Sequence, residues 1–461
     1  MSLSVTTAGR TFRFSNTKEV LAKANEEKSG DRLAGIAADS ALERVAAKSV
    51  LAEMTLADLR NNPVISDDED ELTRLVDDSL DASAWARVKN WTVAELREFI
   101  LSDTSPESIA SIRWALTGEM AAAVAKLMSN MDLVYGARKC PVISRANTTL
   151  GLPGVLAARL QPNHPSDSID GVMASICEGL SFGIGDAVIG INPVYDTPES
   201  VERLLRATHG LIEHLQIPTQ NCVLSHVTTQ MKAIERGAPA GLIFQSIAGT
   251  QRGNTAFGIT TEMLREANSL GKEKCHIATD TPMYFETGQG SELSSRSHND
   301  ADQVTLEARC YAYARLFNPF LVNDVCGFIG PEYLADGRQM IRAGLEDHFM
   351  GKLLGVPMGI DACYTNHMDA DQNDLENLAM LLVSAGVNYF MGVPMGDDVM
   401  LSYQTTSFHD VATLRQLTGC RPAPEFEKWL EQHELMKDGI LTDRAGDATV
   451  IKQMSAVGRE M

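Results

Sequence analysis

The part of this sequence best suited to chemistry is a short apolar segment that ends in one acidic residue. Met283 to Phe285 can be buried on both faces as a parallel strand, and Glu286 follows at its carboxyl edge. Gly288 and Gly290 then let a backbone approach a ligand closely. Taken alone, this pattern is equally typical of an acidic residue before an ordinary turn. Its meaning depends on whether polar residues follow other segments of the same kind.

Segments of the same kind recur after about residue 141, alternating with stretches of helical periodicity. The apolar runs are 155–160, 187–191, 222–225, 242–245, 283–285, 320–325, 358–360 and 389–393. Alternating strands and helices require parallel pairing, and eight units over about 260 residues favour an α/β fold, a (βα)8 TIM barrel. A Rossmann-type sheet is the alternative, but no GxGxxG follows the first run.

Residues that follow the strands of a (βα)8 barrel converge on one mouth, which is where active sites of this fold lie. The predicted mouth residues are Arg159, Gln161, Asn192, Pro193, His226, Gln245, Ser246, Glu286, the run 323–328, Asp361, Met391 and Met395. One arginine, two carboxylates and three amides around an apolar mouth suit a small polar cation better than a phosphate or a sugar. For each residue singly, a satisfied polar group at a strand end is the alternative.

Other kinds of catalytic site lack their motifs in this sequence. There is no HExxH and no histidine pair at ligand spacing beside an acid, so we expect no metal site. No GxSxG elbow follows any of the apolar runs, and no cysteine stands beside an evident histidine partner. Acid–base, electrostatic or cofactor-borne radical catalysis fits what is present.

Composition narrows the class of protein further. The 461 residues carry a formal net charge of -21, which argues against binding to nucleic acid or to an anionic membrane. No apolar run approaches the roughly 20 residues that span a bilayer, and the N-terminus does not have the layout of a secretory signal. The eight cysteines show no paired spacing and are expected to be reduced. We therefore expect a cytoplasmic protein.

Three regions are predicted along the chain. Residues 1–140 are expected to form a mainly helical domain after a hairpin over Leu3 to Phe14, with a capping box at Thr92 and Glu95. Residues 141–420 are expected to form the barrel, with the active site at the carboxyl ends of its strands. Residues 421–461 are expected to form a C-terminal extension.

Six longer stretches of the sequence carry a family resemblance. They are ARLQPN (158–163), GDAVIGINP (185–193), YFETGQGS (284–291), GFIGPEYL (327–334), GLEDHFMGK (344–352) and GDDVML (396–401). These stretches closely resemble the large subunit of ethanolamine ammonia-lyase, and the resemblance extends from Glu19 to Asp447. Long uninterrupted matches of this kind are more specific than a short motif.

The resemblance implies an activity and partners. It implies adenosylcobalamin-dependent radical conversion of ethanolamine to acetaldehyde and ammonia, with a small subunit as partner. It further implies large subunits assembled as a trimer of dimers, and residence in a bacterial microcompartment.

The resemblance also assigns site residues. It implies that Glu286, Gln161 and Asn192 hold the substrate ammonium, that Arg159, Glu286 and Asp361 surround its hydroxyl, and that Leu160 joins this substrate set. Glu286, Arg159 and Asp361 are the implied catalytic residues. It implies cobalamin contacts at Pro193, Gln245, Ser294 and Met400, with apolar walls from Phe257, Phe328, Met391 and Leu401. Apolar residues at strand ends are, in general, more often core residues than cofactor contacts.

Some residues depart from the family pattern. Ile360 precedes Asp361 where a cysteine is expected, and Asp324 and Cys326 stand where uncharged residues are expected, a difference that would alter the charge at the mouth. His348 lies in a motif similar to one whose histidine replaces the lower base of cobalamin. Glu346 stands at the first position of that motif here, so we expect the cofactor to keep its own base and His348 to be structural.

Two other functions remain as alternatives. A barrel lyase or aldolase could use Glu286 and Asp361 as acid and base without cobalamin. A binding or scaffold protein with a vestigial mouth is the other alternative. The presence of Arg159, Gln161, Glu286 and Asp361 together disfavours the scaffold.

Overall fold

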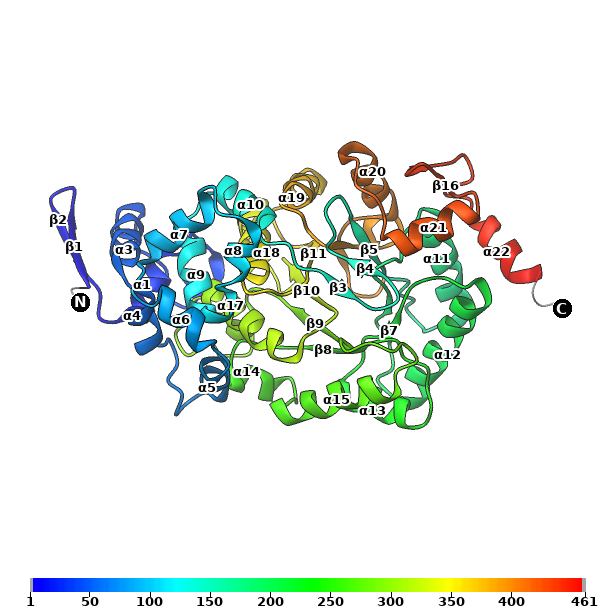
Figure 1. Ribbon diagram of the computed structural model, residues 1–461, viewed down its shortest axis with the longest axis horizontal. Helices are drawn as coiled ribbons and strands as arrows, with labels where there is room; N and C mark the ends of the chain where they lie inside the picture. Colours follow the sequence, from blue (N-terminus) through cyan, green and yellow to red (C-terminus); the bar gives the residue numbers. More distant parts are fainter. Residues whose placement is uncertain (1–2, 458–461) are drawn as a thin grey trace.

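A computed structural model describes residues 3–457, and its centre is one sheet of eight parallel strands (Figure 1). The strands are β5 (Ala157–Leu160), β6 (Val188–Ile191), β7 (Asn221–Val223), β8 (Ile243–Ser246), β9 (Met283–Thr287), β10 (Leu321–Cys326), β11 (Met358–Ala362) and β13 (Tyr389–Gly392). Each of the eight apolar runs predicted from the sequence overlaps one of them. The strands are almost wholly buried, which explains why their sequences read as continuous apolar runs.

The strand order is that of a nearly closed (βα)8 barrel. Around the sheet the order is β7-β6-β5-β13-β11-β10-β9-β8, so each strand lies beside its neighbour in the barrel sequence. Only β7 and β8, at the two ends of this order, lack a regular ladder. The backbone N–H groups of Gly241 and Leu242 donate to the carbonyl of Asn221 near the start of this seam, at 3.0 and 3.1 Å.

The side chain of Gln230 fills the upper part of the seam between β7 and β8. Its Nε2 donates to the carbonyls of Ser225 and Phe244 at 2.6 and 2.7 Å. Its Oε1 accepts from the N–H of Phe244 at 2.9 Å. One buried amide therefore supplies the hydrogen bonds that a strand ladder would otherwise provide.

Helices surround the barrel and connect its strands (Figure 1). They are α11 (Ile169–Ser181), α12 (Pro198–Leu215), α13 (Val227–Glu235), α14 (Gln251–Ala256), α15 (Thr261–Lys274), α16 (Ser291–Ser294), α17 (Gln303–Ala314), α18 (Gly337–Leu353), α19 (Gln372–Ser384) and α20 (Phe408–Thr418). The start of α12 shows why they form here: the side chain of Thr197 accepts from the N–H of Ser200, and Pro198 occupies the first turn.

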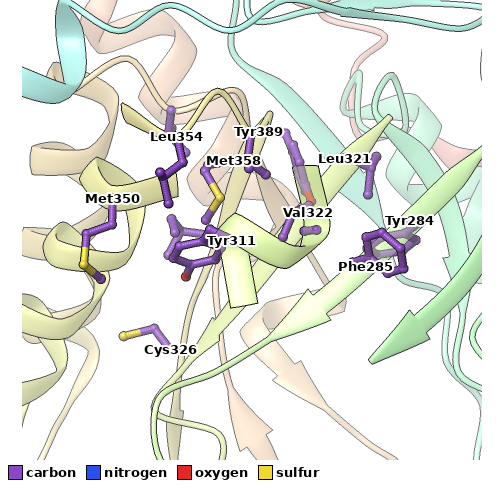
Figure 2. Close-up of a cluster of buried hydrophobic side chains, with 14 of the residues drawn as sticks. Tyr284, Phe285, Tyr311, Leu321, Val322, Cys326, Met350, Leu354, Met358 and Tyr389 are labelled. Atoms are coloured by element: carbon purple, nitrogen blue, oxygen red, sulfur yellow. The ribbon is translucent and has the colours of Figure 1, made fainter. Parts of the chain in front are cut away.

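The main apolar core lies between the outer face of the strands and this ring of helices. Figure 2 shows part of it, where Tyr311 of α17 and Met350 of α18 lie in one buried cluster with Val322 and Met358 of the strands. Both helices are buried along almost their whole length, because a second layer of helices covers them.

That second layer comes from the N-terminal region (Figure 1, blue and cyan). A hairpin of β1 (Ser4–Thr7) and β2 (Arg10–Arg13) opens it, as predicted. Its helices are α1 (Thr17–Ala24), α2 (Ser29–Leu33), α3 (Ala41–Glu53), α4 (Leu56–Asn61), α5 (Glu71–Asp78), α6 (Ala82–Val88), α7 (Val93–Leu101), α8 (Pro106–Ala110), α9 (Gly118–Lys126) and α10 (Asn130–Arg138). The capping box at Thr92 and Glu95 is formed.

The N-terminal helices pack directly on the barrel helices. Helix α9 packs on α17, and α10 packs on α18. The buried apolar residues of both regions belong to one continuous cluster. A separate helical domain over residues 1–140 is therefore not confirmed, although its helical content is.

Buried ion pairs cross the boundary between the N-terminal helices and the barrel. Lys28 donates to Glu346 at 2.7 Å, and both side chains are 0% exposed. Lys126 reaches Asp302 at 2.7 Å and is equally buried. Because a broken buried pair leaves an uncompensated charge, these contacts fix how the helices sit on the barrel.

The chain segments after β11 and β13 fold back over the barrel mouth. Strands β12 (Tyr364–Thr365), β14 (Asp397–Asp398) and β15 (Tyr403–Gln404) form a small antiparallel sheet there. Beyond α20 the chain continues through α21 (Pro424–Gln432), the short pair β16 (Met436–Lys437) and β17 (Ile440–Leu441), and α22 (Ala448–Val457). These elements lie within the predicted extension, residues 421–461, of which residues 458–461 lie outside the described part.

Two expectations from composition can be compared with the structure. All eight cysteines are free thiols, and six of them are buried. Among residues 3–457, no helix combines the length and the apolar character needed to cross a bilayer.

Candidate active site

Strand β9 directs Tyr284 and Glu286 into the barrel, because side chains two apart on a strand share a face. Met283, Phe285 and Thr287 alternate with them and face the helices; Phe285 stacks against Phe317, with ring centroids 5.6 Å apart. Glu286 is the last inward residue of the strand. Its side chain is 14% exposed, so it is reached from the mouth.

Arg159 on β5 lies across the barrel interior from Glu286 and is bound on both terminal nitrogens. Its Nη1 donates to Glu286 Oε1 at 2.5 Å and to the hydroxyl of Tyr284. Its Nη2 donates to the side-chain oxygens of Gln161 and of Asn192, the latter at 3.1 Å. The N–H groups of the planar guanidinium point in different directions, so one side chain can bind all four of these acceptors and fix their positions.

The electrostatic balance at Arg159 favours its charged form. Burial by itself would lower its pKa, but the neighbouring Tyr284 and Glu286 raise the pKa above its ordinary value. Tyr284 also donates to Glu286 Oε1 at 2.8 Å. Hydrogen bonding and charge therefore both favour the ion pair of Arg159 and Glu286.

Asp398, in the small sheet over the mouth, holds the amides of the site from above. Gln161 Nε2 donates to Asp398 Oδ2 at 2.6 Å and to the Tyr403 hydroxyl at 3.1 Å. Asn163 donates to the same Asp398 oxygen at 2.8 Å and accepts from the backbone N–H of Asn192 at 2.8 Å. The orientation of the mouth amides therefore depends on the segment that follows β13.

Asp361 on β11 is the second inward carboxylate and is fully buried. The hydroxyl of Thr405 donates to its Oδ1, whereas its Oδ2 has no hydrogen-bond partner. Burial raises the pKa of Asp361 to about 7, although Thr405 and Arg159 partly oppose this shift. Near neutral pH this group can therefore either give up or accept a proton.

Several of the predicted cofactor contacts lie around the mouth. Met391 and Tyr403 form a small apolar cluster of their own, against which Phe328 and Leu401 pack. The rings of Phe328 and Tyr403 meet edge to face, with centroids 5.2 Å apart.

The other predicted cofactor contacts follow different strands. Pro193, just after β6, and Met400, beside Leu401, are half-buried. Phe257 follows the last residue of α14 and is half-buried, and Ser294 ends α16 and is exposed.

Three other predicted residues make contacts away from Arg159 and Glu286. The side chain of Leu160 packs outside the barrel, where a β-carbon on Gly179 of α11 would collide with it. The side chain of Gln245 accepts from the N–H of Val227 at 2.9 Å, at the start of α13. His226 is the N-cap of α13, and its side chain accepts from the N–H of Thr228.

The expectation that Asp324 and Cys326 change the charge of the mouth is wrong. Asp324 is in register with Thr287, which faces the helices, and Cys326 contacts the carbonyl of Met340 on α18 at 3.2 Å. Asp324 lies beside Glu307 of α17, outside the barrel. Strand alternation decides this, because Asn323, one residue earlier, is the residue that faces inward.

Asp324, Glu307 and Asp347 form a buried acidic cluster between the barrel and its helices. All three are 0% exposed. Burial and the neighbouring Glu292 raise the pKa of Glu307 to about 8. Burial also raises the pKa values of Asp324 and Asp347 well above their usual range, and the carboxyls of this cluster add to the effect. Across residues 3–457, no group of His, Cys, Asp or Glu side chains is arranged to hold a metal ion.

Sequence reasoning missed five residues of the site: Tyr284, Asn163, Asp398, Tyr403 and Thr405. Tyr284 could have been found, because it lies two residues before Glu286 on the same strand. Asn163 lies two residues after Gln161, but it follows the strand, so the same two-residue spacing is weaker evidence for it. The other three lie in the segments around the small sheet, whose place over the mouth only the tertiary structure gives.

A cluster of charged and amide side chains at the carboxyl mouth of a (βα)8 barrel defines a barrel enzyme that acts on a small polar molecule. Comparison with known proteins identifies the family to which this enzyme belongs. The sequence pattern of the family described as "Ethanolamine ammonia lyase large subunit (EutB)" matches residues 12–444. The chain belongs to this family, and therefore to the carbon–nitrogen lyases.

Curated relatives agree over the whole length. The "Ethanolamine ammonia-lyase large subunit" of Escherichia coli (strain K12) is 59% identical over 451 residues, covering 98% of this chain and 100% of that protein. The protein of the same name from Salmonella typhimurium gives the same identity and coverage.

One of the matching solved structures is far more distant in sequence. The truncated 3-deoxy-D-arabino-heptulosonate 7-phosphate synthase of Thermotoga maritima is 12% identical, with a TM-score of 0.36, over 60% of this chain and 94% of that chain. A likeness this weak supports no conclusion.

Proposed function

We propose that this chain is the catalytic large subunit of an adenosylcobalamin-dependent lyase that converts the ethanolamine cation to acetaldehyde and ammonium. The observation that carries the proposal is the position of Glu286. It is the partly exposed member of an ion pair whose other member, Arg159, is 1% exposed. A cationic substrate entering the mouth therefore meets a carboxylate that is already oriented.

The residues of the site can hold each end of ethanolamine. Glu286 binds the ammonium through a charge-assisted hydrogen bond, and the Gln161 and Asn192 amides lie within the same network. The unpaired Nε of Arg159 and the free Oδ2 of Asp361 are available to the hydroxyl. As the amine leaves and the oxygen becomes a carbonyl, Asp361 accepts the hydroxyl proton and Arg159 stabilises the developing charge.

The mouth suits a large cofactor with an apolar face. Val194, Tyr195, Met395 and Val399, in the segments after β6 and β13, leave between 41% and 77% of their surface exposed. A bound group that covered them would remove this apolar surface from water. Pro193, Phe328, Met400 and Leu401 would then hold adenosylcobalamin. When bound, this cofactor supplies the radical that takes a hydrogen atom from the carbinol carbon and later returns one.

Partners follow from the family name and from the surface. The relatives are named as large subunits, which implies a small subunit as partner. Met131 and Tyr135 on α10 and Met380 on α19 are exposed apolar residues on two helices that pack together. Such a surface supports the further proposal of a large-subunit oligomer, a trimer of dimers. Cytoplasmic residence within a microcompartment belongs to the same proposal.

The first test is the activity itself. The purified chain, with and without the small subunit, is mixed in the dark with adenosylcobalamin and ethanolamine, and acetaldehyde is followed through a coupled dehydrogenase. Acetaldehyde is expected only when the cofactor and the small subunit are both present. Acetaldehyde without the cofactor would instead support acid–base catalysis by Glu286 and Asp361. No acetaldehyde from a folded complex would remove the proposal.

A further inference from the structure

Asn323 lies at the same level of the barrel as Glu286. It is on β10, in register with Glu286 on one side and with Gly359 of β11 on the other. Residues in register on neighbouring strands point to the same face of the sheet, so the side chain of Asn323 enters the barrel beside that of Glu286. It is fully buried.

Both polar atoms of the Asn323 side chain lack a hydrogen-bond partner. Gln161 and Asn192 differ from Asn323 in this respect. The side-chain oxygens of Gln161 and Asn192 both accept from Arg159, and Gln161 also donates to Asp398. Asn323 is therefore the amide beside Glu286 whose whole hydrogen-bonding capacity is free.

An amide in this state is costly to the folded protein. Burying an amide without a partner costs free energy, and the great majority of buried polar side chains are paired. On the β11 side, no polar side chain stands in register with Asn323. Gly359 contributes no side chain, the ring of Tyr389 occupies the space above Gly359, and the hydroxyl of Tyr389 is also without a partner. An unpaired amide beside a substrate carboxylate is best explained by a ligand that supplies the missing partner.

We propose that Asn323 is a further substrate-binding residue, whose Oδ1 accepts a hydrogen bond from the substrate ammonium beside Glu286. This rests on the proposed function. An ammonium group carries three N–H donors and no acceptor, so a single carboxylate leaves part of it unsatisfied. The free Oδ1 of Asn323 satisfies another of these donors without adding a second negative charge.

The test compares two buried asparagines changed to leucine. Asn323→Leu removes the proposed contact but breaks no hydrogen bond within the protein. The matched control is Asn388→Leu, just before β13, where Nδ2 donates to the carbonyl of Val142 at 3.0 Å. Ethanolamine affinity is measured by calorimetry on the complex with the small subunit, without cofactor, and the melting temperature is measured for each variant.

The expected result is opposite for the two variants. Asn323→Leu weakens ethanolamine binding about 10- to 100-fold, as for the loss of one hydrogen bond to a charged group, and leaves the melting temperature within a degree or two of wild type. Asn388→Leu lowers the melting temperature and leaves the affinity unchanged.

Three results would overturn the assignment. Equal affinity in Asn323→Leu and wild type removes Asn323 from the site while the proposed function stands. A lower melting temperature with unchanged affinity in Asn323→Leu shows a structural role, such as an internal contact with Tyr389. A wild-type complex that does not bind ethanolamine removes the proposed function and the role of Asn323 together.

Discussion

At the scale of single residues, the site depends on Arg159, whose two terminal nitrogens are both engaged in hydrogen bonds. Arg159 donates to Glu286, Tyr284, Gln161 and Asn192, and its side chain is almost completely buried. This arrangement keeps the carboxylate of Glu286 in place before substrate arrives, which lowers the cost of ordering the site on binding. The same contacts therefore fix both the position of the Glu286 carboxylate and the charge that surrounds it.

We predict that Glu286→Gln folds and binds cofactor but loses activity. The substitution keeps the shape of the side chain and removes the charge that faces the substrate ammonium. The loss in kcat/KM is expected to be about 10²- to 10³-fold, the range for removal of one strong electrostatic contact in an active site. Steady-state kinetics of the reconstituted complex measure it, and cobalamin absorbance reports cofactor binding.

Glu332→Gln serves as the matched control for Glu286→Gln. Glu332 is exposed in the segment after β10, so its charge is screened by water, and wild-type kinetics are expected. Near-normal turnover in Glu286→Gln would contradict the role given to that carboxylate.

At the scale of elements, a side chain takes the place of the backbone hydrogen-bond ladder where the barrel closes between β7 and β8. Strands β7 and β8 stand at the two ends of the hydrogen-bonded order, and Gln230 from α13 makes three hydrogen bonds across the space between them. A helix that packs on the outside of a barrel thereby becomes part of its closure.

We predict that Gln230→Leu destabilises the barrel at this seam. It leaves two carbonyls and one N–H buried without partners, each costing about 1 kcal/mol or more. The free energy of unfolding should fall by about 3 kcal/mol, with a melting temperature several degrees lower in thermal unfolding. Amide exchange at Phe244 should also become faster.

Gln416→Leu is the control for the seam. Gln416 is an exposed residue of α20, and its substitution should leave both the melting temperature and the exchange at Phe244 unchanged. If Gln230→Leu is as stable as this control, the seam does not depend on Gln230.

At the scale of the whole molecule, the N-terminal helices cover α17 and α18. A group of carboxyl side chains beside these two helices is thereby buried as well. Asp324, Glu307 and Asp347 are buried together, and neither oxygen of Asp324 has a hydrogen-bond partner. Groups of like charge in a buried place favour their protonated forms. Their state therefore links the stability of the fold to pH.

We predict that stability declines as pH rises from about 4 towards 8 because of this cluster. Its carboxyls have raised pKa values in the folded protein, that of Glu307 to about 8. The folded state therefore holds protons that the unfolded state has already released, and stability falls with pH over that interval. Asp324→Asn removes one such carboxyl, and should raise the free energy of unfolding by about 1–3 kcal/mol at pH 8 and by less at pH 5.

Melting temperatures from pH 5 to pH 9 measure this difference between Asp324→Asn and wild type. Asp68→Asn is the control, because Asp68 is an exposed carboxylate in the turn before α5. Its melting curve should follow wild type at every pH. A gain in Asp324→Asn that is the same at pH 5 and pH 8 would contradict the role of protonation.

The sequence by itself determined which segments become strands and where the main chemical groups stand. Buried parallel strands need continuous apolar residues, and the residues that follow them must meet at one mouth. Arg159, Gln161, Asn192, Glu286 and Asp361 were all found in this way, and the family was evident from long matching stretches.

The tertiary structure decided which side of each strand a residue faces and what lies over the mouth. Asp324 points to the helices and Asn323 to the barrel interior, because their alternation is fixed by the pairing of β10 with β9. Asp398 and Tyr403 reach the site because β14 and β15 fold back over it. Such contacts join residues more than 200 positions apart, so no local pattern in the chain encodes them.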